Sequence, residues 1–584
     1  MTQAMDRLRI LAFGLMAGAV AAGCAAGPPA EETADLVLRN GHVVTVDSTQ
    51  PEAEAVAVRG HTIIAVGSDE DMARYIGSDT EVIDLEGRLA IPGFIEGHGH
   101  FAGIGESLLG LDLMNARNWD EIVATVGAAA RDAKQDAWIV GRGWHQEKWD
   151  RVPETTVDGV PVHASLDSVS PNNPVLLTHA SGHASFVNGR ALELAGITRD
   201  TPNPPGGEIV KDAQGEPTGL LRETAQRLAG SVRARAEAER PAEDLEAERR
   251  RVMELAAQEA LSKGVTSFHD AGTGFGTIDL MKQLEAEDAL PVRLYVMIRA
   301  SNDELEERLP DYYMPADSND YLVVRSIKVS IDGALGSHGA WLLEPYEDMP
   351  TSTGLSLVQP ESVERTAELA IANGFQLAVH AIGDRANREV LDIYEQTFQA
   401  HPEMADPRWR IEHAQHLHPD DIGRFGELGV IAAMQGVHAT SDAPWIPRRL
   451  GEQRAREGAY VWQELMNSGA VIANGTDAPV EDVNPIISFH SSVSRRTNTG
   501  EVFYGDQRMT REQALRTYTL NNAYAAFEED LKGSITPGKL ADIVVLSHDI
   551  MRMPEAEIPT AQVDLTIVGG EVRYERPAGA VSRR

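Results

Sequence analysis

Two histidines, one residue apart, close an apolar run near residue 100. In "LAIPGFIEGHGHF" they are His98 and His100. If residues 94–100 form a strand, alternate side chains share a face, so both imidazoles project together from its C-terminal end. Two converging imidazoles suggest a metal site. An isolated H-x-H more often marks a polar turn, so partners elsewhere in the chain must decide.

Metal-ligand residue types also end other short apolar runs. "QLAVHAIGD" carries His380, "RIEHAQ" carries His413 and "VIANGTDAP" carries Asp477. Imidazole nitrogen and carboxylate oxygen are the ligands of zinc and similar divalent ions. A lone strand histidine is more often a packing residue, but the whole set at equivalent strand ends predicts a metal centre. We expect one or two divalent ions, with zinc preferred.

One lysine lies inside an apolar run. Lys328 stands in "VVRSIKVSIDGALGS", whereas the other lysines mostly have polar neighbours. Burial disfavours the ammonium form and lowers the pKa, which leaves a nucleophilic amine. Such an amine can react with carbon dioxide to give a carbamate that bridges two metal ions. The alternative is an ion pair between Lys328 and Asp332 or another carboxylate, and without the carbamate the site could hold one ion only.

These residues belong to a series of short apolar runs that alternate with helical patterns. The runs lie at residues 93–100, 264–272, 291–299, 325–333, 375–384, 408–415, 429–438 and 471–479. Apolar runs of this kind are typical of parallel strands buried on both faces. Eight strands alternating with helices predict an α/β fold, a (β/α)8 TIM barrel, in which reactive groups sit at the C-terminal strand ends.

The first connection of this barrel is unusually long. It runs from about residue 102 to 262 and predicts an inserted subdomain whose last part, 238–264, has a helical pattern. Its mouth-facing loops are expected to recognise the substrate. The candidates for substrate binding are Trp144 and His183 in this insertion and His438 after the seventh strand. Each could instead be a structural residue.

Short alternating apolar runs with turn signals occupy both ends of the mature chain. Residues 35–92 contain an Asn-Gly turn, and residues 533–576 contain glycines between apolar runs. Both patterns are typical of small antiparallel sheets. We expect one composite β-sandwich built from both segments, with the barrel at 93–532. Two unrelated hairpins are the alternative.

The N-terminus has the pattern of an export signal. Arg7 and Arg9 precede an apolar stretch that ends in small residues and Cys24, the only cysteine. The stretch is too short for a mature membrane span, so residues 1–24 predict a signal peptide. The position of Cys24 resembles a bacterial lipobox. We expect a lipid-anchored protein of the bacterial cell envelope with a tether at 25–34, and ordinary signal cleavage is the alternative.

The overall charge restricts the partners. The 584 residues include 89 acidic and 52 basic side chains, a net charge of -37. Such a charge repels nucleic acid and anionic headgroups. We therefore expect a small-molecule substrate, no nucleic acid, and membrane contact only through the N-terminal anchor. The oligomeric state, including a homo-oligomer, stays open.

Several motifs in order resemble the metal-dependent amidohydrolase superfamily, and within it the YtcJ-like amidohydrolase family 3. They are "IPGFIEGHGH", "GGEIVKDAQGEPTGLLRE", "IKVSIDGALGS", "VHAIGDRA", "RIEHAQ", "NGTDAPVEDVNP" and "ITPGKLADIVVL". The resemblance implies a metal-dependent barrel with a composite β-sandwich. It also implies the metal ligands His98, His100, Lys328 (carboxylated in many members), His380, His413 and Asp477. One departure is Glu96, where many members have Asp.

The resemblance implies hydrolysis of a carbon-nitrogen bond in an amide, formamide or cyclic amide. A divalent ion lowers the pKa of water and polarises a carbonyl, and Asp477 would carry the proton to the leaving nitrogen. Two alternatives remain. The same site could act on an ester, lactone or phosphotriester, or the chain could be a non-catalytic lipoprotein that binds a small molecule.

Overall fold

The computed structural model describes residues 33–157, 159–404 and 406–577. The predicted signal peptide, Cys24 and nearly all of the predicted tether lie outside these residues. Within the described part of the chain, no helix combines the length and the apolar character needed to cross a membrane.

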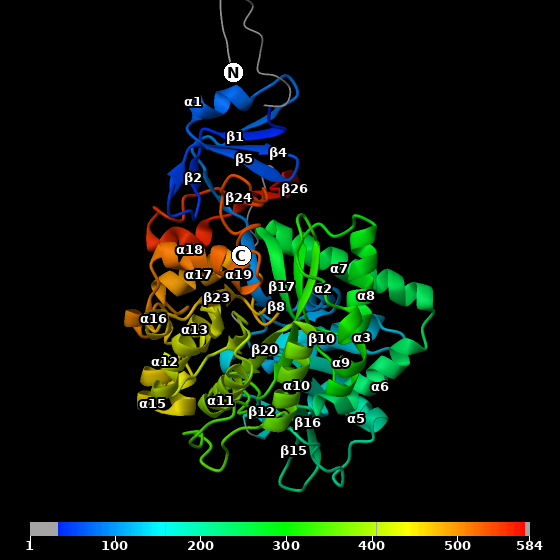
Figure 1. The fold of residues 1–584 in the computed structure, drawn as a ribbon. Helices are drawn as coiled ribbons and strands as arrows, with labels where there is room; N and C mark the ends of the chain where they lie inside the picture. Colours follow the sequence, from blue (N-terminus) through cyan, green and yellow to red (C-terminus); the bar gives the residue numbers. More distant parts are fainter. Residues whose placement is uncertain (1–32, 158, 405, 578–584) are drawn as a thin grey trace, which may run out of the picture.

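An eight-stranded parallel sheet forms the centre of the molecule, as the sequence predicts (Figure 1). Its strands follow one another in chain order: β8 (Phe94–Gly99), β17 (Val265–Thr273), β18 (Arg293–Ile298), β19 (Leu322–Ser330), β20 (Gln376–Ala381), β21 (Arg410–His413), β22 (Ile431–Gln435) and β23 (Ile472–Gly475). Nearly all of their residues are buried, because helices cover the outside and side chains fill the inside. The TIM-barrel prediction is confirmed.

The two end strands of this sheet meet and close the ring. The backbone N–H of Asp477 donates to the carbonyl of His98 at 2.7 Å, and the N–H of His100 donates to the carbonyl of Ala478 at 2.7 Å. Strand β8 ends at Gly99, so His100 already lies at the start of helix α2. Barrel closure therefore brings the first and eighth strand ends together, which is where the predicted ligands lie.

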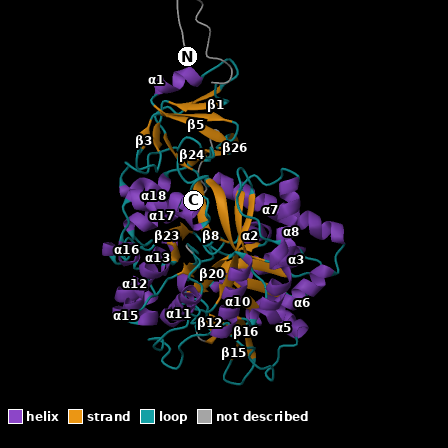
Figure 2. Cartoon of the chain, viewed as in Figure 1, coloured by secondary structure: helices purple, strands orange, loops and turns teal. Residues whose placement is uncertain are grey.

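Helices surround the barrel (Figure 2). They are α2 (Phe101–Leu109), α7 (Ala242–Ser262), α8 (Phe275–Ala286), α9 (Asn302–Arg308), α10 (Pro360–Asn373), α11 (Asp384–Ala400), α12 (Pro419–Leu428), α13 (Gly436–Asp442), α14 (Ile446–Leu450), α15 (Glu452–Gly458), α16 (Trp462–Asn467), α17 (Pro485–Ser494), α18 (Arg511–Thr517) and α19 (Leu520–Ala525). Helices α10 and α12 end at Gly374 and Gly429, which adopt positive φ of 75° and 67°. Glycine tolerates this left-handed conformation, so each helix stops there and the next strand begins.

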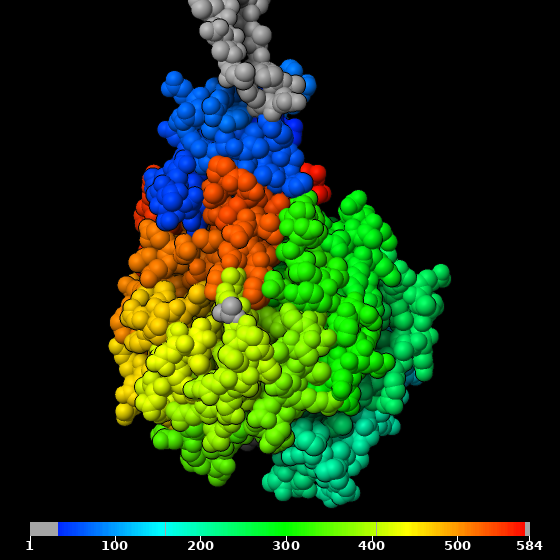
Figure 3. Space-filling model, in the orientation of Figure 1, coloured from blue at the N-terminus to red at the C-terminus, as the bar shows by residue number. Residues whose placement is uncertain are grey.

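The predicted insertion between β8 and β17 is a sheet covered by helices. Its strands run in the order β15 (Gly207–Lys211), β16 (Pro217–Glu223), β14 (Ala184–Val187), β13 (Val175–His179), β10 (Ile139–Trp144) and β9 (Leu111–Asp112), beside the hairpin β11 (Thr156–Val157) and β12 (Val160–Pro161). Its helices are α3 (Trp119–Asp132), α4 (Ala164–Val169), α5 (Gly189–Ala195) and α6 (Gln226–Ala238). The insertion packs against one flank of the barrel (Figure 3).

Both chain ends contribute to one β domain, which confirms the predicted composite sandwich. One sheet contains β5 (Thr62–Gly67), β4 (Ala55–Arg59), β1 (Leu36–Arg39) and β6 (Glu81–Asp84). The other contains β26 (Glu571–Glu575), β25 (Val563–Val568), β24 (Ile543–Leu546), β7 (Leu89–Pro92), β2 (His42–Val44) and β3 (Glu52–Ala53). Strand β24 pairs directly with β7, and a short helix, α1 (Asp69–Met72), covers the first sheet. Apolar residues of the two sheets share one core.

A buried ion pair connects this β domain to the barrel. Arg293 begins barrel strand β18, and Asp542 precedes β24. Their side chains are 2% and 5% exposed, and Nε of Arg293 donates to Oδ2 of Asp542 at 2.9 Å. Arg293 also donates to the carbonyls of Asn319 and Asp320. The contact fixes the C-terminal segment against the barrel wall.

Candidate metal centre

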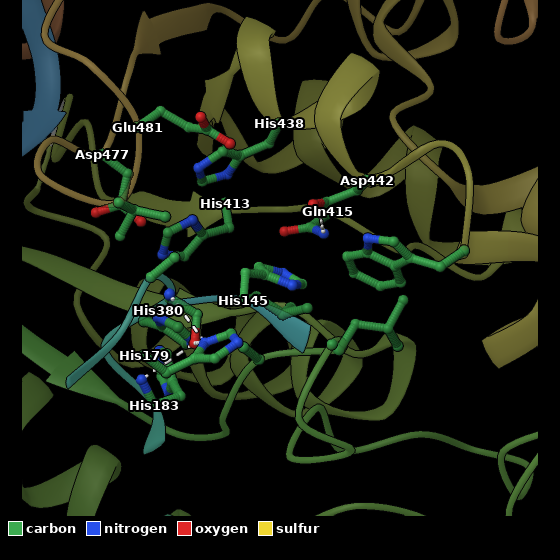
Figure 4. A pocket seen from close by; sticks show the side chains of 18 of the residues that line it. His145, His179, His183, His380, His413, Gln415, His438, Asp442, Asp477 and Glu481 are labelled. Carbon is green, nitrogen blue, oxygen red and sulfur yellow. Dashed lines mark hydrogen bonds between the residues drawn. The ribbon is translucent and has the colours of Figure 1, made fainter. Parts of the chain in front are cut away.

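Three of the predicted ligands, His380, His413 and Asp477, line a cavity at the C-terminal ends of the barrel strands. The cavity holds about 590 Å³ of empty space, and both barrel and insertion residues line it. Figure 4 shows His183, His380, His413 and Asp477 on one side of it, with Gln415 and Asp442 on the other. This is the end of a TIM barrel at which reactive groups are expected.

Three residues from the two closing strands form a first possible ligand group. Nε2 of His100 lies 3.2 Å from Oδ1 of Asp477, and Nε2 of His98 lies 3.6 Å from the same oxygen. One ligand atom from each of the three residues lies within 4.8 Å of the others. At this spacing the three atoms can bind the same ion, because ligand atoms stand about 2 Å from a bound ion.

A second group shares Asp477 with the first. His413 and His438 each bring a nitrogen within 4.8 Å of the other and of an Asp477 oxygen. The His413 and His438 rings are almost parallel, with an interplanar angle of 13°. His438 is one of the predicted substrate-binding residues, so the structure places it among candidate ligands. Two groups that share one carboxylate can accommodate one ion or two.

Hydrogen bonds orient the histidine of the first strand. Nδ1 of His98 is in a very short hydrogen bond with Oε2 of Glu412. Because the carboxylate only accepts, Nδ1 carries the proton and Nε2 keeps its lone pair facing Asp477. Arg410 donates to the Glu412 carboxylate through Nε at 2.7 Å and holds it in place. Glu412 therefore holds the imidazole of His98 in the orientation in which Nε2 can bind a metal ion.

A neutral amide orients His413 in the same way. Nδ1 of His413 lies 2.8 Å from Oε1 of Gln435, and Nε2 of Gln435 donates to the carbonyl of Ala433 at 3.1 Å. Because Nε2 of Gln435 makes this second bond, Oε1 is the amide atom that faces His413. The proton of His413 therefore sits on Nδ1, which leaves Nε2 as the nitrogen available to a metal ion.

Glu96, left unexplained by the sequence, holds the segment that carries Asp477. Its Oε1 accepts the backbone N–H of Thr476 at 2.5 Å, and its Oε2 accepts the Thr476 hydroxyl at 3.1 Å. Asp477 has a positive φ of 57°, a conformation that non-glycine residues adopt only when their surroundings hold them in it. Glu96 therefore positions the aspartate, and its Oε1 also accepts the backbone N–H of the candidate ligand His98 at 3.4 Å.

Lys328 and His380 face the same region but belong to neither group. Among the described residues, the buried Nζ of Lys328 donates only to the carbonyl of Ala271, at 3.4 Å. Asp332 instead accepts the backbone N–H groups of Ile382 and Gly383, so the ion pair considered for Lys328 does not form. The ring of His380 packs against that of His413, with ring centres 4.4 Å apart.

Burial sets the charge states of these groups. It lowers the pKa of His98 to about 4 and the pKa values of His380 and His413 well below the usual range. Burial, reinforced by the charge of Arg299, lowers the pKa of Lys328 to about 7. Burial alone would raise the pKa of Asp477, but the bond with His100 and the nearby histidines hold it well below its ordinary value. Neutral imidazoles beside an ionised carboxylate are ready to bind a metal ion.

Unpartnered buried atoms test whether the site fits a metal ion. Nε2 of His98 and Nε2 of His438 make no hydrogen bond within the described part of the chain, and Oδ1 of Asp477 also lacks one of good geometry. A buried polar atom without a partner costs about 1–3 kcal/mol. Divalent metal binding by the two groups that share Asp477 would satisfy these atoms, so the donor set fits a metal site.

The remaining predicted residues have different positions. His183 lines the cavity, and its Nδ1 lies 2.7 Å from Oε2 of Glu223. Burial acts to lower the pKa of His183, but the Glu223 carboxylate outweighs it and raises the pKa. Trp144 does not line the cavity: it is 1% exposed in the core of the insertion, where its indole N–H donates to the carbonyl of Leu177. Trp144, the last residue of β10, packs into the apolar core of the insertion. This position does not support contact with the substrate.

Sequence reasoning missed the residues that orient the ligands from other strands. Gln435 ends an apolar run, as a ligand would, but nothing in the sequence pairs it with His413. Glu223 follows the apolar part of "TGLLRE" and contacts His183 only because β14 and β16 are neighbours. A polar residue that ends an apolar run was the one available signal in both cases.

Comparison with known proteins gives the family. A family model described as amidohydrolase family matches residues 81–574. The chain belongs to the amidohydrolase family. It is therefore a hydrolase acting on carbon-nitrogen bonds, and the predicted resemblance is confirmed. The matched residues include the whole barrel and the part of the β domain that begins at β6.

Relatives of this amidohydrolase match it over nearly their full length. It is 36% identical to Protein LONG AFTER FAR-RED 3 of Arabidopsis thaliana (94% of this chain, 93% of the relative). It is 32% identical to the putative amidohydrolase YtcJ of Bacillus subtilis (92% and 99%). It is 28% identical to an N-substituted formamide deformylase of Arthrobacter pascens (93% and 98%).

A solved structure shows the same architecture. An uncharacterized metal-dependent hydrolase from Pyrococcus furiosus superposes with a TM-score of 0.68 at 27% identity, covering 88% of this chain and 100% of that one. The likeness extends beyond the barrel, because a match of this length includes the insertion and the β domain.

Proposed function

We propose that this amidohydrolase cleaves the C–N bond of an amide, formamide or cyclic amide, with Asp477 as the proton carrier. The observation that supports this most strongly is that, among the described residues, buried donor atoms of His98, His438 and Asp477 lack hydrogen-bond partners and belong to two ligand groups that share Asp477. The relative that acts as an N-substituted formamide deformylase favours formamides within this class.

A divalent ion, with zinc preferred for this nitrogen and oxygen donor set, would supply water activation and carbonyl polarisation. It would be held by His98, His100, His413, His438 and Asp477, with His380 and Lys328 beside them. The ionised Asp477 takes a proton from the attacking water and delivers it to the leaving nitrogen, which needs the proton to depart as an amine. The backbone conformation of Asp477 keeps its carboxylate close to His98 and His100.

We further propose that Lys328 forms a carbamate. Its amine is buried, largely unpaired and neutral for much of the time near pH 7. The nitrogen would attack carbon dioxide, a C–N bond would form and the amine proton would leave. The product is an anionic group with two oxygens, which suits a second ion beside the first.

The test is a substrate panel assayed with metal-loaded protein. It contains N-formyl, N-acyl and cyclic amides together with esters, lactones and phosphotriesters. We expect faster hydrolysis of the C–N compounds, with formamides leading. A preference for the oxygen or phosphorus compounds would replace the proposal by the alternative reaction. Absence of both hydrolysis and a stoichiometric divalent ion would refute it.

A further inference from the structure

A second cavity also reaches the candidate metal centre, and its lining includes all six predicted ligands. It holds about 2720 Å³ of empty space, open to solvent, between the barrel and the insertion. The two cavities share His183, His380, His413 and Asp477. A substrate bound at the metal centre can therefore extend in two directions, and the two walls differ in chemistry.

Three arginines in the wall of the second cavity lack acidic partners. They are Arg142 from β10, Arg227 from α6 and Arg299 just after β18. Among the described residues, none of the three has a carboxylate within the 4.0 Å of an ion pair. Arg142 donates only to carbonyls, that of Ala180 at 3.0 Å and that of Pro479 at 3.4 Å.

Such arginines are unexpected in a chain with a net charge of -37. Arg233 lines the same cavity, and its Nε donates to Glu237 at 2.7 Å. A guanidinium is costly to leave unpaired in a partly enclosed space, because both burial and like charge oppose it. Glu106 and Asp477 also line this cavity, but neither forms an ion pair with the three arginines, so these guanidinium groups face the cavity without a counter-charge in contact.

The position of Arg299 is built into the barrel. It lies against Gly272 of β17, where a Cβ atom would be 2.6 Å from Nε of the arginine. Its terminal nitrogen donates to the hydroxyl of Ser330, at the end of β19, at 3.2 Å. Burial, followed by the charge of Arg227, lowers the pKa of Arg299. The side chain is thus held at the strand ends, and it lies near a second cation.

We propose that Arg299 and Arg227, with Arg142 opposite, bind a carboxylate of the substrate, so that the substrate is an anionic amide of the N-formyl or N-acyl amino acid type. Arginine suits this task, because its planar fork pairs with both oxygens of a carboxylate. The inference rests on the proposed hydrolysis of a C–N bond. The apolar part of the substrate lies in the first cavity, against Leu335 and Trp445.

A different role for Arg299 is the main rival. It could balance negative charge at the metal centre, since its charge also affects Lys328. In that case Arg299 would matter for every substrate, charged or neutral. Arg299 belongs to the barrel, whereas Arg227 and Arg142 belong to the insertion. If all three bind the carboxylate, variants in either part should lose activity on the anionic substrate and keep it on the neutral one.

The experiment compares N-formylphenylalanine, in both enantiomers, with N-formylphenethylamine, which lacks only the carboxylate. We expect the wild-type protein to prefer one enantiomer of the anion. Arg299→Leu and Arg227→Leu should each lower kcat/KM for the anion roughly 10- to 100-fold, mainly through KM, and leave the neutral compound within about threefold.

The matched control is Arg233→Leu, which removes a paired arginine from the same cavity wall and should change neither substrate. Metal content and circular dichroism verify that each variant is loaded and folded. Hydrolysis of the neutral compound without any preference for the anion would refute the inference and leave the proposed function standing. If Arg299→Leu lowered kcat/KM equally for both compounds, Arg299 would be assigned to the metal centre instead. Hydrolysis of neither compound would overturn both proposals.

Discussion

Glu412 is hydrogen-bonded to Nδ1 of His98, although the two residues are 314 positions apart in the chain. They belong to the sixth and first barrel strands, and both are buried. The bond decides which nitrogen of His98 keeps a lone pair, and Arg410 in turn holds the carboxylate. One cross-barrel contact thus prepares a ligand before any ion binds.

Glu412→Gln should weaken metal binding about 10- to 100-fold, because the amide orients His98 less firmly and makes it less basic. It should also destabilise the fold, since Arg410 loses a buried counter-charge. Competition with a chelator of known affinity, carried out on folded protein, measures the change in metal affinity. Glu427→Gln, on the exposed side of α12, is the control. Unchanged affinity would refute the orienting role.

Asp477→Asn should reduce hydrolysis by a factor of about 10² to 10⁴ and leave the fold intact. Asparagine tolerates the positive φ at this position, so the loss would report chemistry and not backbone strain. Steady-state kinetics with the preferred amide and melting curves measure the two effects. Asp482→Asn, nearby and exposed, should behave as wild type. Near-normal turnover with metal bound would remove Asp477 from its assigned role.

Removal of the metal ion should lower the melting temperature. An ion at 1,000 times its Kd stabilises the fold by about 4 kcal/mol, and without it the unpartnered atoms of His98 and Asp477 stay unsatisfied. Differential scanning fluorimetry before and after chelation, followed by zinc addition, measures the shift. His98→Asn should respond less to the chelator. A chelator-insensitive wild type with no bound ion would contradict the metal site.

Asp542→Ala should cost about 3–5 kcal/mol in the free energy of unfolding, because it leaves Arg293 charged and buried without its partner. Urea denaturation measures the difference. The exposed pair between Glu52 and Arg552 provides the control, and Glu52→Ala should cost no more than about 1 kcal/mol. Equal effects of the two substitutions would show that the buried pair has no special role in joining the domains.

We propose that Cys24 carries the lipid anchor predicted from the sequence; the residue lies outside the described part of the chain. Cys24→Ser should move the protein from the membrane fraction to the soluble fraction and abolish labelling with a radioactive fatty acid. Fractionation and labelling of expressing cells test this. An unlabelled wild-type protein in the soluble fraction would favour ordinary signal cleavage.

The sequence by itself determined the architecture and the types of side chain at the site. Apolar runs recur because each barrel strand is buried on both faces, and this pattern is local enough to locate all eight. Polar residues that end such runs, among them His98, His413 and Asp477, must meet at one rim of a closed parallel barrel. Composition and order were sufficient for these conclusions.

Only the tertiary structure decided which atoms meet. It placed His438 with His413 and Asp477, put Trp144 into the core of the insertion, and ruled out the alternative in which Lys328 pairs with Asp332. These outcomes depend on strand register, side-chain direction and the docking of a subdomain, which join residues hundreds of positions apart. No local pattern encodes such contacts, because burial and hydrogen bonding are satisfied by partners that only the complete fold brings within reach.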